Sequence, residues 1–220
     1  MIKCIVFDFD GTLVKSNEIK RELFFKVIQP YGDYDFIVES VLREKAEADR
    51  YVILTEIASR LIATGNLVEN VSSDELAFSL ISNYAKSSEE MIVSCEEVSG
   101  TTELLNSLLI KGISLFINSA TPLNPLKKIL MLRLFDKYFA GVYGRPNSKI
   151  ENMQIIMDVT KSEPSEIIFI GDNEVDRQTA ETIGCYFIGI NNASSCFAFE
   201  PNYSAINMTE AKSIIFNMLI

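Results

Sequence analysis

Four short apolar runs, rich in isoleucine, valine and phenylalanine, constrain the fold of this 220-residue chain more than any other feature of its sequence. They are bounded by glycine, aspartate or asparagine and cover residues 2–7, 113–118, 167–170 and 185–190. Short runs that are mainly apolar, rather than alternating regularly with polar residues, are typical of strands buried on both faces. The sequence therefore predicts a parallel sheet.

Helical patterns lie between these runs. In residues 101–112, leucines recur on one helical face and a glycine ends the pattern. Further along, we expect Thr121 to cap a helix that has Pro122 at its first position. Ser148 and Glu151 have the spacing of a capping box. The alternation of strands and helices predicts an α/β fold with a Rossmann-like parallel-sheet core.

Residues 15–96 interrupt this alternation, because they contain several amphipathic helical stretches and no convincing strand. We expect them to form an all-helical domain, a cap, inserted into the α/β core. The core would then consist of residues 1–14 and 97–220, and the helical stretches of the cap include residues 17–32, 51–65 and 72–93.

The charge balance and the absence of histidine exclude several classes of function. The net charge is −10, which argues against a general nucleic-acid or anionic-membrane surface, because phosphate groups attract positive fields. A small anionic substrate stays compatible with this charge if a few lysines or a metal act locally. With no histidine, the chain lacks the usual zinc ligand and cannot use a Ser–His or Cys–His mechanism.

The cysteines point to a reducing compartment. Cys4, Cys95, Cys185 and Cys196 are far apart and form no CxxC pair, and two of them lie in apolar runs. We expect buried, reduced thiols and a cytoplasmic protein. The apolar N-terminal run is too short for a signal peptide, and no run approaches the ~18–20 residues needed to span a bilayer. The sequence predicts no particular oligomeric state.

Polar residues stand where the predicted strands end or the following helices begin. In an open α/β sheet, ligands bind at the carboxyl ends of the strands, so these side chains are expected to converge. They are Asp8 and Asp10 in "FDFDGT", Ser119 in "FINSAT", Lys149 at a predicted helix start, and Asp172 and Asp176 in "IFIGDNEVD".

The chemistry of these side chains predicts phosphoryl transfer. Several carboxylates in one place repel each other unless a cation joins them, and oxygen ligands without histidine or thiolate suit Mg²⁺. A metal, the Ser119 hydroxyl and the Lys149 ammonium could together neutralise three phosphoryl oxygens. One carboxylate would then attack phosphorus while another handles the proton.

Each of these residues also has a purely structural interpretation. An Asp-Gly pair after a strand is often only a turn. Ser119 could cap the next helix, and Asp176 could interact with a helix dipole. For the cationic role, Lys161 and Arg145 lie near Lys149 in the sequence and compete with it.

The order of these motifs resembles that of the haloacid dehalogenase superfamily. "DFDGT", the strand-end Ser119, Lys149 and "GDNEVD" follow one another as the four motifs of that family do. The resemblance covers nearly all the chain, and the helical insertion looks like the cap of the phosphoglycolate phosphatase and β-phosphoglucomutase branch. Dehalogenases of the family lack an aspartate at the position of Asp10, so the resemblance implies phosphate chemistry.

The resemblance also implies a role for each residue. Asp8 would be the nucleophile, and Asp10 would protonate the leaving group and then activate water. Side chains of Asp8 and Asp172, with the Asp10 backbone carbonyl, would hold Mg²⁺. The remaining expected roles are phosphoryl binding by Ser119, Lys149 and Gly11, shaping of the loop by Gly11 and Thr12, and support of the metal or of Lys149 by Asp176.

Three departures from the family pattern bear on the reaction. Lys15 stands where many relatives have aspartate, which affects the entrance or hinge rather than the motif. Pro122 stands where sugar-phosphate mutases tend to have lysine, and the cap has no histidine. We therefore expect a phosphatase for a small phosphorylated metabolite. The alternatives are a sugar-phosphate mutase or other phosphotransferase, and a catalytically silent binding protein.

Overall fold

The chain divides into two compact units, one α/β and one helical. The computed structural model describes residues 1–45, 48–65, 71–192, 195 and 197–219. Met1–Asn17 and Ile92–Ile220 form the first unit, and Glu18–Met91 forms the second. The assignment of residues 15–96 as a cap domain stays a prediction.

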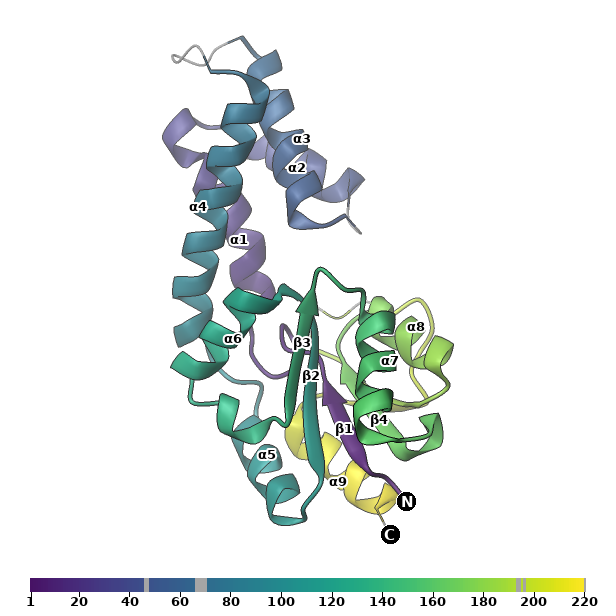
Figure 1. The fold of residues 1–220 in the computed structure, drawn as a ribbon. Coiled ribbons are helices and arrows are strands. Elements are labelled where there is room, and N and C mark those ends of the chain that lie inside the picture. Colours follow the sequence, from purple (N-terminus) through teal and green to yellow (C-terminus); the bar gives the residue numbers. More distant parts are fainter. Residues whose placement is uncertain (46–47, 66–70, 193–194, 196, 220) are drawn as a thin grey trace. The chain divides into compact units, whose positions relative to one another are not determined.

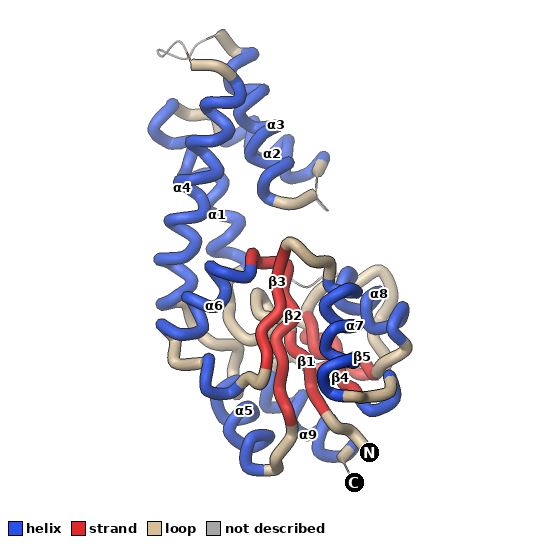
Figure 2. The backbone as a smooth tube through the Cα atoms, viewed as in Figure 1, coloured by secondary structure: helices blue, strands red, loops and turns tan. Residues whose placement is uncertain are grey.

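A six-stranded parallel sheet forms the centre of the first unit (Figures 1 and 2), which confirms the predicted α/β fold. The strand order is β3-β2-β1-β4-β5-β6. The two edge strands, β3 and β6, were not predicted, because β3 contains two glycines and β6 is short and largely exposed. The strands are β1 (Cys4–Phe7), β2 (Ser114–Pro122), β3 (Gly141–Arg145), β4 (Ile167–Gly171), β5 (Tyr186–Ile190) and β6 (Tyr203–Ala205).

Helices cover both faces of this sheet, which explains the apolar runs in its central strands. Ile5 and Phe7 of β1 pack in a core with α5, α6 and α9, whereas Cys4 and Val6 pack with α7 and α8 (Figure 1). The helices of this layer structure are α5 (Thr101–Ile110), α6 (Leu123–Leu132), α7 (Lys149–Thr160), α8 (Glu174–Ile183) and α9 (Met208–Met218). Short 3₁₀ turns cover Gln29–Tyr31, Asp136–Tyr138 and Pro164–Glu166.

The register of the central strands places the polar residues at one edge. Phe7 of β1 pairs with Ile117 of β2 and with Ile170 of β4, and the Asp8 N–H donates to the Ile170 carbonyl at 2.8 Å. The residues that follow Phe7, Ile117 and Ile170 therefore lie next to one another at one edge of the sheet. The sequence predicted that the second strand ends before Ser119. In the structure β2 continues to Pro122 through a register irregularity.

The start of α7 is as predicted, and the start of α6 is not. Ser148 and Glu151 form a capping box at the start of α7. The predicted Thr121 cap is wrong, because Pro122 is the N-cap of α6 and no side chain caps that helix. The Thr121 hydroxyl is directed to Asp10 instead.

The described residues of the second unit form helices joined by turns and short loops, and they include no strand. It contains α2 (Asp35–Glu44) and α3 (Arg50–Ala63), and it shares α1 (Asn17–Ile28) and α4 (Ser73–Ser94) with the first unit at their ends. Its buried core is apolar and includes Leu23, Val38, Leu54, Ile57 and Leu80. The helices alternate apolar and polar faces, as their sequence periodicity indicates.

The two segments of the first unit that lead to and from the helical unit are paired with each other. The Lys15 N–H donates to the Glu96 carbonyl at 2.8 Å, and the Val98 N–H donates to the Leu13 carbonyl at 3.0 Å. The Lys15 ammonium also lies 2.8 Å from the Glu96 carboxylate. The departure of Lys15 from the family pattern is thus accompanied by a local ion pair.

The described cysteines are free thiols, as the sequence predicted. Cys4 is buried, and Cys95 and Cys185 are partly buried, all three as free thiols, while Cys196 lies outside the described residues. Burial raises the pKa of Cys185 to about 12, which makes its thiol unreactive. Within the described ranges, the helices are too short or too polar to cross a bilayer.

Candidate active site

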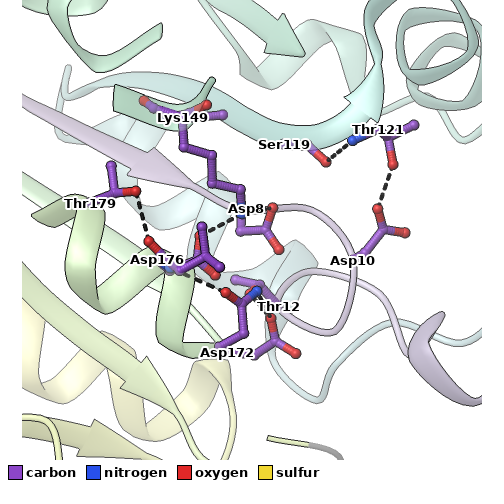
Figure 3. A network of polar contacts seen from close by, with 12 residues as sticks. Asp8, Asp10, Thr12, Ser119, Thr121, Lys149, Asp172, Asp176 and Thr179 are labelled. Atoms are coloured by element: carbon purple, nitrogen blue, oxygen red, sulfur yellow. Dashed lines mark hydrogen bonds and ion pairs between the residues drawn. The ribbon is translucent and has the colours of Figure 1, made fainter. Parts of the chain in front are cut away.

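A buried lysine lies at the centre of the polar cluster in the first unit. The Lys149 ammonium lies 2.9 Å from Asp8 Oδ1 and also contacts Asp176 Oδ1 (Figure 3). The side chains are 7%, 4% and 0% exposed, in that order. The capping box of α7 fixes Lys149 as the first helical residue, so the backbone position of this lysine is well determined.

Negative charge exceeds positive charge in this cluster. Burial raises the pKa of Asp8, and burial raises the pKa of Asp176 to about 8 despite the attraction of Lys149. Burial and the neighbouring Asp8 raise the pKa of Asp172 to about 7. Burial opposes the charge of Lys149, but the carboxylates outweigh it and hold the lysine pKa above its usual value. The cluster thus contains one ammonium and three buried carboxyl groups, of which Lys149 contacts Asp8 and Asp176.

A hard divalent cation fits this excess of carboxylate. One oxygen each of Asp8, Asp172 and Asp176 lies within 4.8 Å of the others. In addition, Asp176 Oδ2 is buried with no hydrogen-bond partner. A set of oxygen ligands without histidine or thiolate is the donor set that Mg²⁺ prefers.

The loop after β1 packs closely against Asp172. Asn17 Nδ2 donates to Asp172 Oδ2 at 2.7 Å, and Thr12 Oγ1 donates to Asp172 Oδ1 at 3.4 Å. Gly11 has a φ of +77°, and a Cβ there would lie 2.0 Å from Asp172 Oδ2. Only glycine therefore allows this approach. The Gly11 N–H donates to the Val14 carbonyl at 2.8 Å, within the loop itself.

Asp10 is held by two hydroxyl groups rather than by the lysine. Ser16 Oγ donates to Asp10 Oδ1 at 2.6 Å, and Thr121 Oγ1 donates to Asp10 Oδ2 at 2.7 Å. Figure 3 shows the Asp10 carboxylate directed toward Thr121 and away from Asp8. The two aspartates of "DFDGT" thus have different partners.

Ser119 lies beside this hydroxyl network and is 1% exposed. Its Oγ accepts a hydrogen bond from the Thr121 N–H at 3.1 Å. Among the predicted site residues, the structure brings Asp8, Lys149 and Asp176 into contact. Asp10 and Ser119 are connected to each other through Thr121 (Figure 3).

Several residues of the network were missed by the sequence analysis. Asn118 Nδ2 donates to the Lys149 carbonyl at 2.8 Å, and Asn152 Nδ2 donates to Asn118 Oδ1 at 3.0 Å. An asparagine at the end of an apolar strand was a usable signal for Asn118. Ser16, Asn17 and Thr121 gave no such signal, because short polar residues near helix starts are usually caps.

This geometry brings a buried carboxyl group, a fixed ammonium and further carboxyl groups together in an arrangement that could hold a divalent cation. Residues 5–190 match the family model of the haloacid dehalogenase-like hydrolases. The chain belongs to this family. The sequence-based resemblance is thereby confirmed, and the hydrolase is an enzyme whose family motifs lie at the polar edge of the sheet.

Relatives of the hydrolase are similar along almost their whole length, but at low identity. A pyrophosphatase PpaX of Listeria monocytogenes is 23% identical over 97% of the chain and 96% of its own length. A phosphoglycolate phosphatase of Vibrio parahaemolyticus is 24% identical over the same shares. The solved structure of a HAD-superfamily hydrolase of subfamily IA from Geobacter sulfurreducens has a TM-score of 0.69 and 20% identity, covering 99% of this chain and 96% of that one.

Proposed function

We propose that this hydrolase is a Mg²⁺-dependent phosphatase that acts on a small phosphomonoester through an aspartyl phosphate on Asp8. The contact between the Lys149 ammonium and Asp8 carries the proposal. An anionic nucleophile attacks an anionic phosphate only where fixed positive charge offsets their repulsion. The match to a hydrolase family supports hydrolysis, and the names of two relatives, a pyrophosphatase and a phosphoglycolate phosphatase, support phosphoryl transfer to water.

In the first step, an Asp8 carboxylate oxygen attacks phosphorus and the bond from phosphorus to the leaving oxygen breaks. Asp10, protonated at this stage, donates its proton to the leaving oxygen. The alcohol leaves, and phosphorus is now bonded to Asp8 as an acyl phosphate. Asp10 is two residues from the nucleophile but has separate partners, so the two carboxyl groups can differ in protonation.

In the second step, Asp10 takes a proton from a water molecule whose oxygen attacks phosphorus. The bond between phosphorus and Asp8 breaks, which releases inorganic phosphate and restores the Asp8 carboxylate. Asp10 is again protonated and ready for the next substrate. The same residue thus serves first as acid and then as base.

The side chains of Asp8 and Asp172, with the Asp10 carbonyl, would hold Mg²⁺. When bound, the metal supplies charge that neutralises the carboxylates and the phosphoryl oxygens. We assign Asp176 to orienting Lys149, since the two are in contact. Thr12 supports Asp172.

Ser119 and Lys149 are the proposed phosphoryl-binding groups, because they offer a hydroxyl and an ammonium close to the nucleophile strand. The Gly11 N–H is engaged within its loop, so we assign Gly11 to loop shape and close approach rather than to hydrogen bonding. The cationic residues of the helical unit are weak candidates for substrate recognition. Arg60, for example, pairs with Glu44 at 2.6 Å and Glu56 at 2.8 Å.

A panel of phosphorylated compounds tests this proposal. It contains 4-nitrophenyl phosphate, pyrophosphate, phosphoglycolate and several sugar phosphates, each assayed with Mg²⁺ and with EDTA. We expect Mg²⁺-dependent phosphate release, abolished by EDTA and lost on the order of 10³-fold in Asp8→Asn, whose amide cannot form the acyl phosphate. Absence of turnover across the panel would favour the silent binding protein.

A further inference from the structure

We propose that Thr121 is a positioning residue that orients Asp10 for proton transfer to the leaving group. This inference rests on the proposed phosphatase function. It assigns a role to a residue that the sequence presents only as a helix cap, and whose hydroxyl caps no helix in the structure.

Thr121 connects Asp10 and Ser119, two proposed site residues that Lys149 does not contact. Its hydroxyl donates to Asp10 Oδ2 at 2.7 Å, and its N–H donates to Ser119 Oγ at 3.1 Å. The residue is 7% exposed, so these bonds are largely shielded from water. One residue of β2 thus holds both the proposed acid and the proposed phosphate-binding hydroxyl (Figure 3).

The origin of the two hydroxyls that hold Asp10 distinguishes their roles. Ser16 belongs to the same loop as Asp10, so its 2.6 Å bond fixes the side chain relative to that loop. Thr121 belongs to the neighbouring strand of the sheet, which pairs with β1 through Phe7 and Ile117. The Thr121 bond therefore fixes Asp10 relative to the sheet, and hence relative to Asp8.

The local shape of β2 makes this contact possible. The pairing of β2 with β3 shifts register between Asn118 and Pro122, which is the segment that contains Ser119 and Thr121. Irregularities of this kind re-aim side chains at the ends of strands. Within this irregular segment the Thr121 hydroxyl donates to Asp10 Oδ2, and the Thr121 N–H donates to Ser119 Oγ.

A misplaced acid slows only the reactions that need it. Departure of an alkoxide requires protonation in the transition state, whereas 4-nitrophenolate leaves readily without a proton. Loss of the Thr121 hydroxyl should therefore slow alkyl phosphates selectively. A general packing defect would slow both kinds of substrate.

The test compares Thr121→Val, Thr121→Ser and Thr160→Val on ethyl phosphate and 4-nitrophenyl phosphate. Valine keeps the shape of threonine and removes the hydroxyl, while serine keeps the hydroxyl. Thr160 is a matched control, because its hydroxyl donates to a carbonyl of its own helix α7, that of Ile156 at 2.7 Å, and Thr160 is not one of the proposed site residues. Melting temperatures verify that every variant is folded.

For Thr121→Val we expect kcat/KM on ethyl phosphate to fall about 10- to 100-fold, and on 4-nitrophenyl phosphate less than about threefold. With 4-nitrophenyl phosphate, kcat and KM should fall together, because Asp10 is also the base for hydrolysis of the acyl phosphate. Thr121→Ser and Thr160→Val should stay within about threefold of the parent on both substrates.

Two results would overturn the inference while leaving the phosphatase intact. They are an equal loss of kcat/KM on both substrates in Thr121→Val, and no loss on either. Failure of the proposed function itself would be visible without any Thr121 variant, as turnover of the parent enzyme in the absence of Mg²⁺ or as an active Asp8→Asn variant. That result would overturn the role of Thr121 as well.

Discussion

The side-chain amide of Asn118 donates a hydrogen bond to the backbone carbonyl of Lys149 at 2.8 Å. This bond joins β2 to the first residue of α7, and Asn152 on the next turn of the helix donates to the same asparagine at 3.0 Å. All three residues are buried. The buried amide pair therefore helps to fix the backbone position of Lys149.

The first prediction concerns this amide pair. Asn118→Leu removes the side-chain donor to the Lys149 carbonyl and leaves the buried Asn152 amide without its acceptor, which should lower the free energy of unfolding by about 1–3 kcal/mol. We also expect kcat to fall by about tenfold, because Lys149 is less well placed. Urea unfolding and steady-state kinetics measure the two effects.

Asn106→Ala is the control for Asn118→Leu. Asn106 also donates to a backbone carbonyl, that of Thr102 at 2.9 Å, but it lies exposed on α5. Its replacement should change the free energy of unfolding by less than about 0.5 kcal/mol and leave kcat unchanged. Equal effects of the two substitutions would contradict a positioning role for Asn118.

The second prediction separates Lys149 from Lys161, its rival in the sequence analysis. Lys149→Met leaves the buried Asp8 and Asp176 without their cation, which should cost the metal-free protein about 3–5 kcal/mol of stability. Activity should fall about 10³-fold or more, since the phosphoryl group loses its ammonium. Lys161→Met alters an exposed side chain and should be silent in both assays. An inactive Lys161→Met enzyme would reverse the assignment.

The third prediction concerns pH and Mg²⁺ together. The pKa values of Asp172 and Asp176 are raised in the folded protein to about 7 and about 8, from an ordinary value of 3.8. Between these limits the folded state binds more protons than the unfolded state, so the metal-free protein should lose stability as pH rises. Mg²⁺ replaces the protons, and its stabilising effect should therefore increase with pH.

Thermal unfolding at pH about 5 and about 8, with EDTA or with Mg²⁺, measures this linkage. We expect a lower melting temperature at the higher pH in EDTA, and a larger gain from Mg²⁺ there. Asp172→Asn should flatten both dependences. A metal-free protein that becomes more stable over this pH range would show that the carboxyl groups are ionised without a cation.

The sequence was informative where local patterns decide the structure. Short apolar runs predicted the four inner strands of the sheet, and the capping box predicted the start of α7. The polar residues after β1 and β4 were found because the carboxyl ends of parallel strands share one edge.

Contacts across the sheet could not be predicted in the same way. Thr121 has the local pattern of a helix cap, and only the register shift of β2 directs its hydroxyl to Asp10. Asn17 is 155 residues from Asp172 in the sequence, yet its amide donates to that carboxylate. A local sequence pattern does not indicate contacts between residues so far apart in the chain. The edge strand β3 was missed for a related reason, because pairing with β2 compensates for the low strand propensity of its glycines.

The last prediction separates phosphatase from mutase. A mutase must protect its aspartyl phosphate from water until a sugar hydroxyl collects the phosphoryl group. The chain has no histidine to hold that sugar, and it has Pro122 where a mutase is expected to have a lysine. Asp10 is instead held by the hydroxyls of Ser16 and Thr121, a setting in which it can activate water.

Water should therefore accept nearly all phosphoryl groups, even with a large excess of a sugar acceptor. A ³¹P NMR time course with a hexose 1-phosphate and a trace of its bisphosphate measures this partition. Accumulation of hexose 6-phosphate with little free phosphate would identify the enzyme as a mutase.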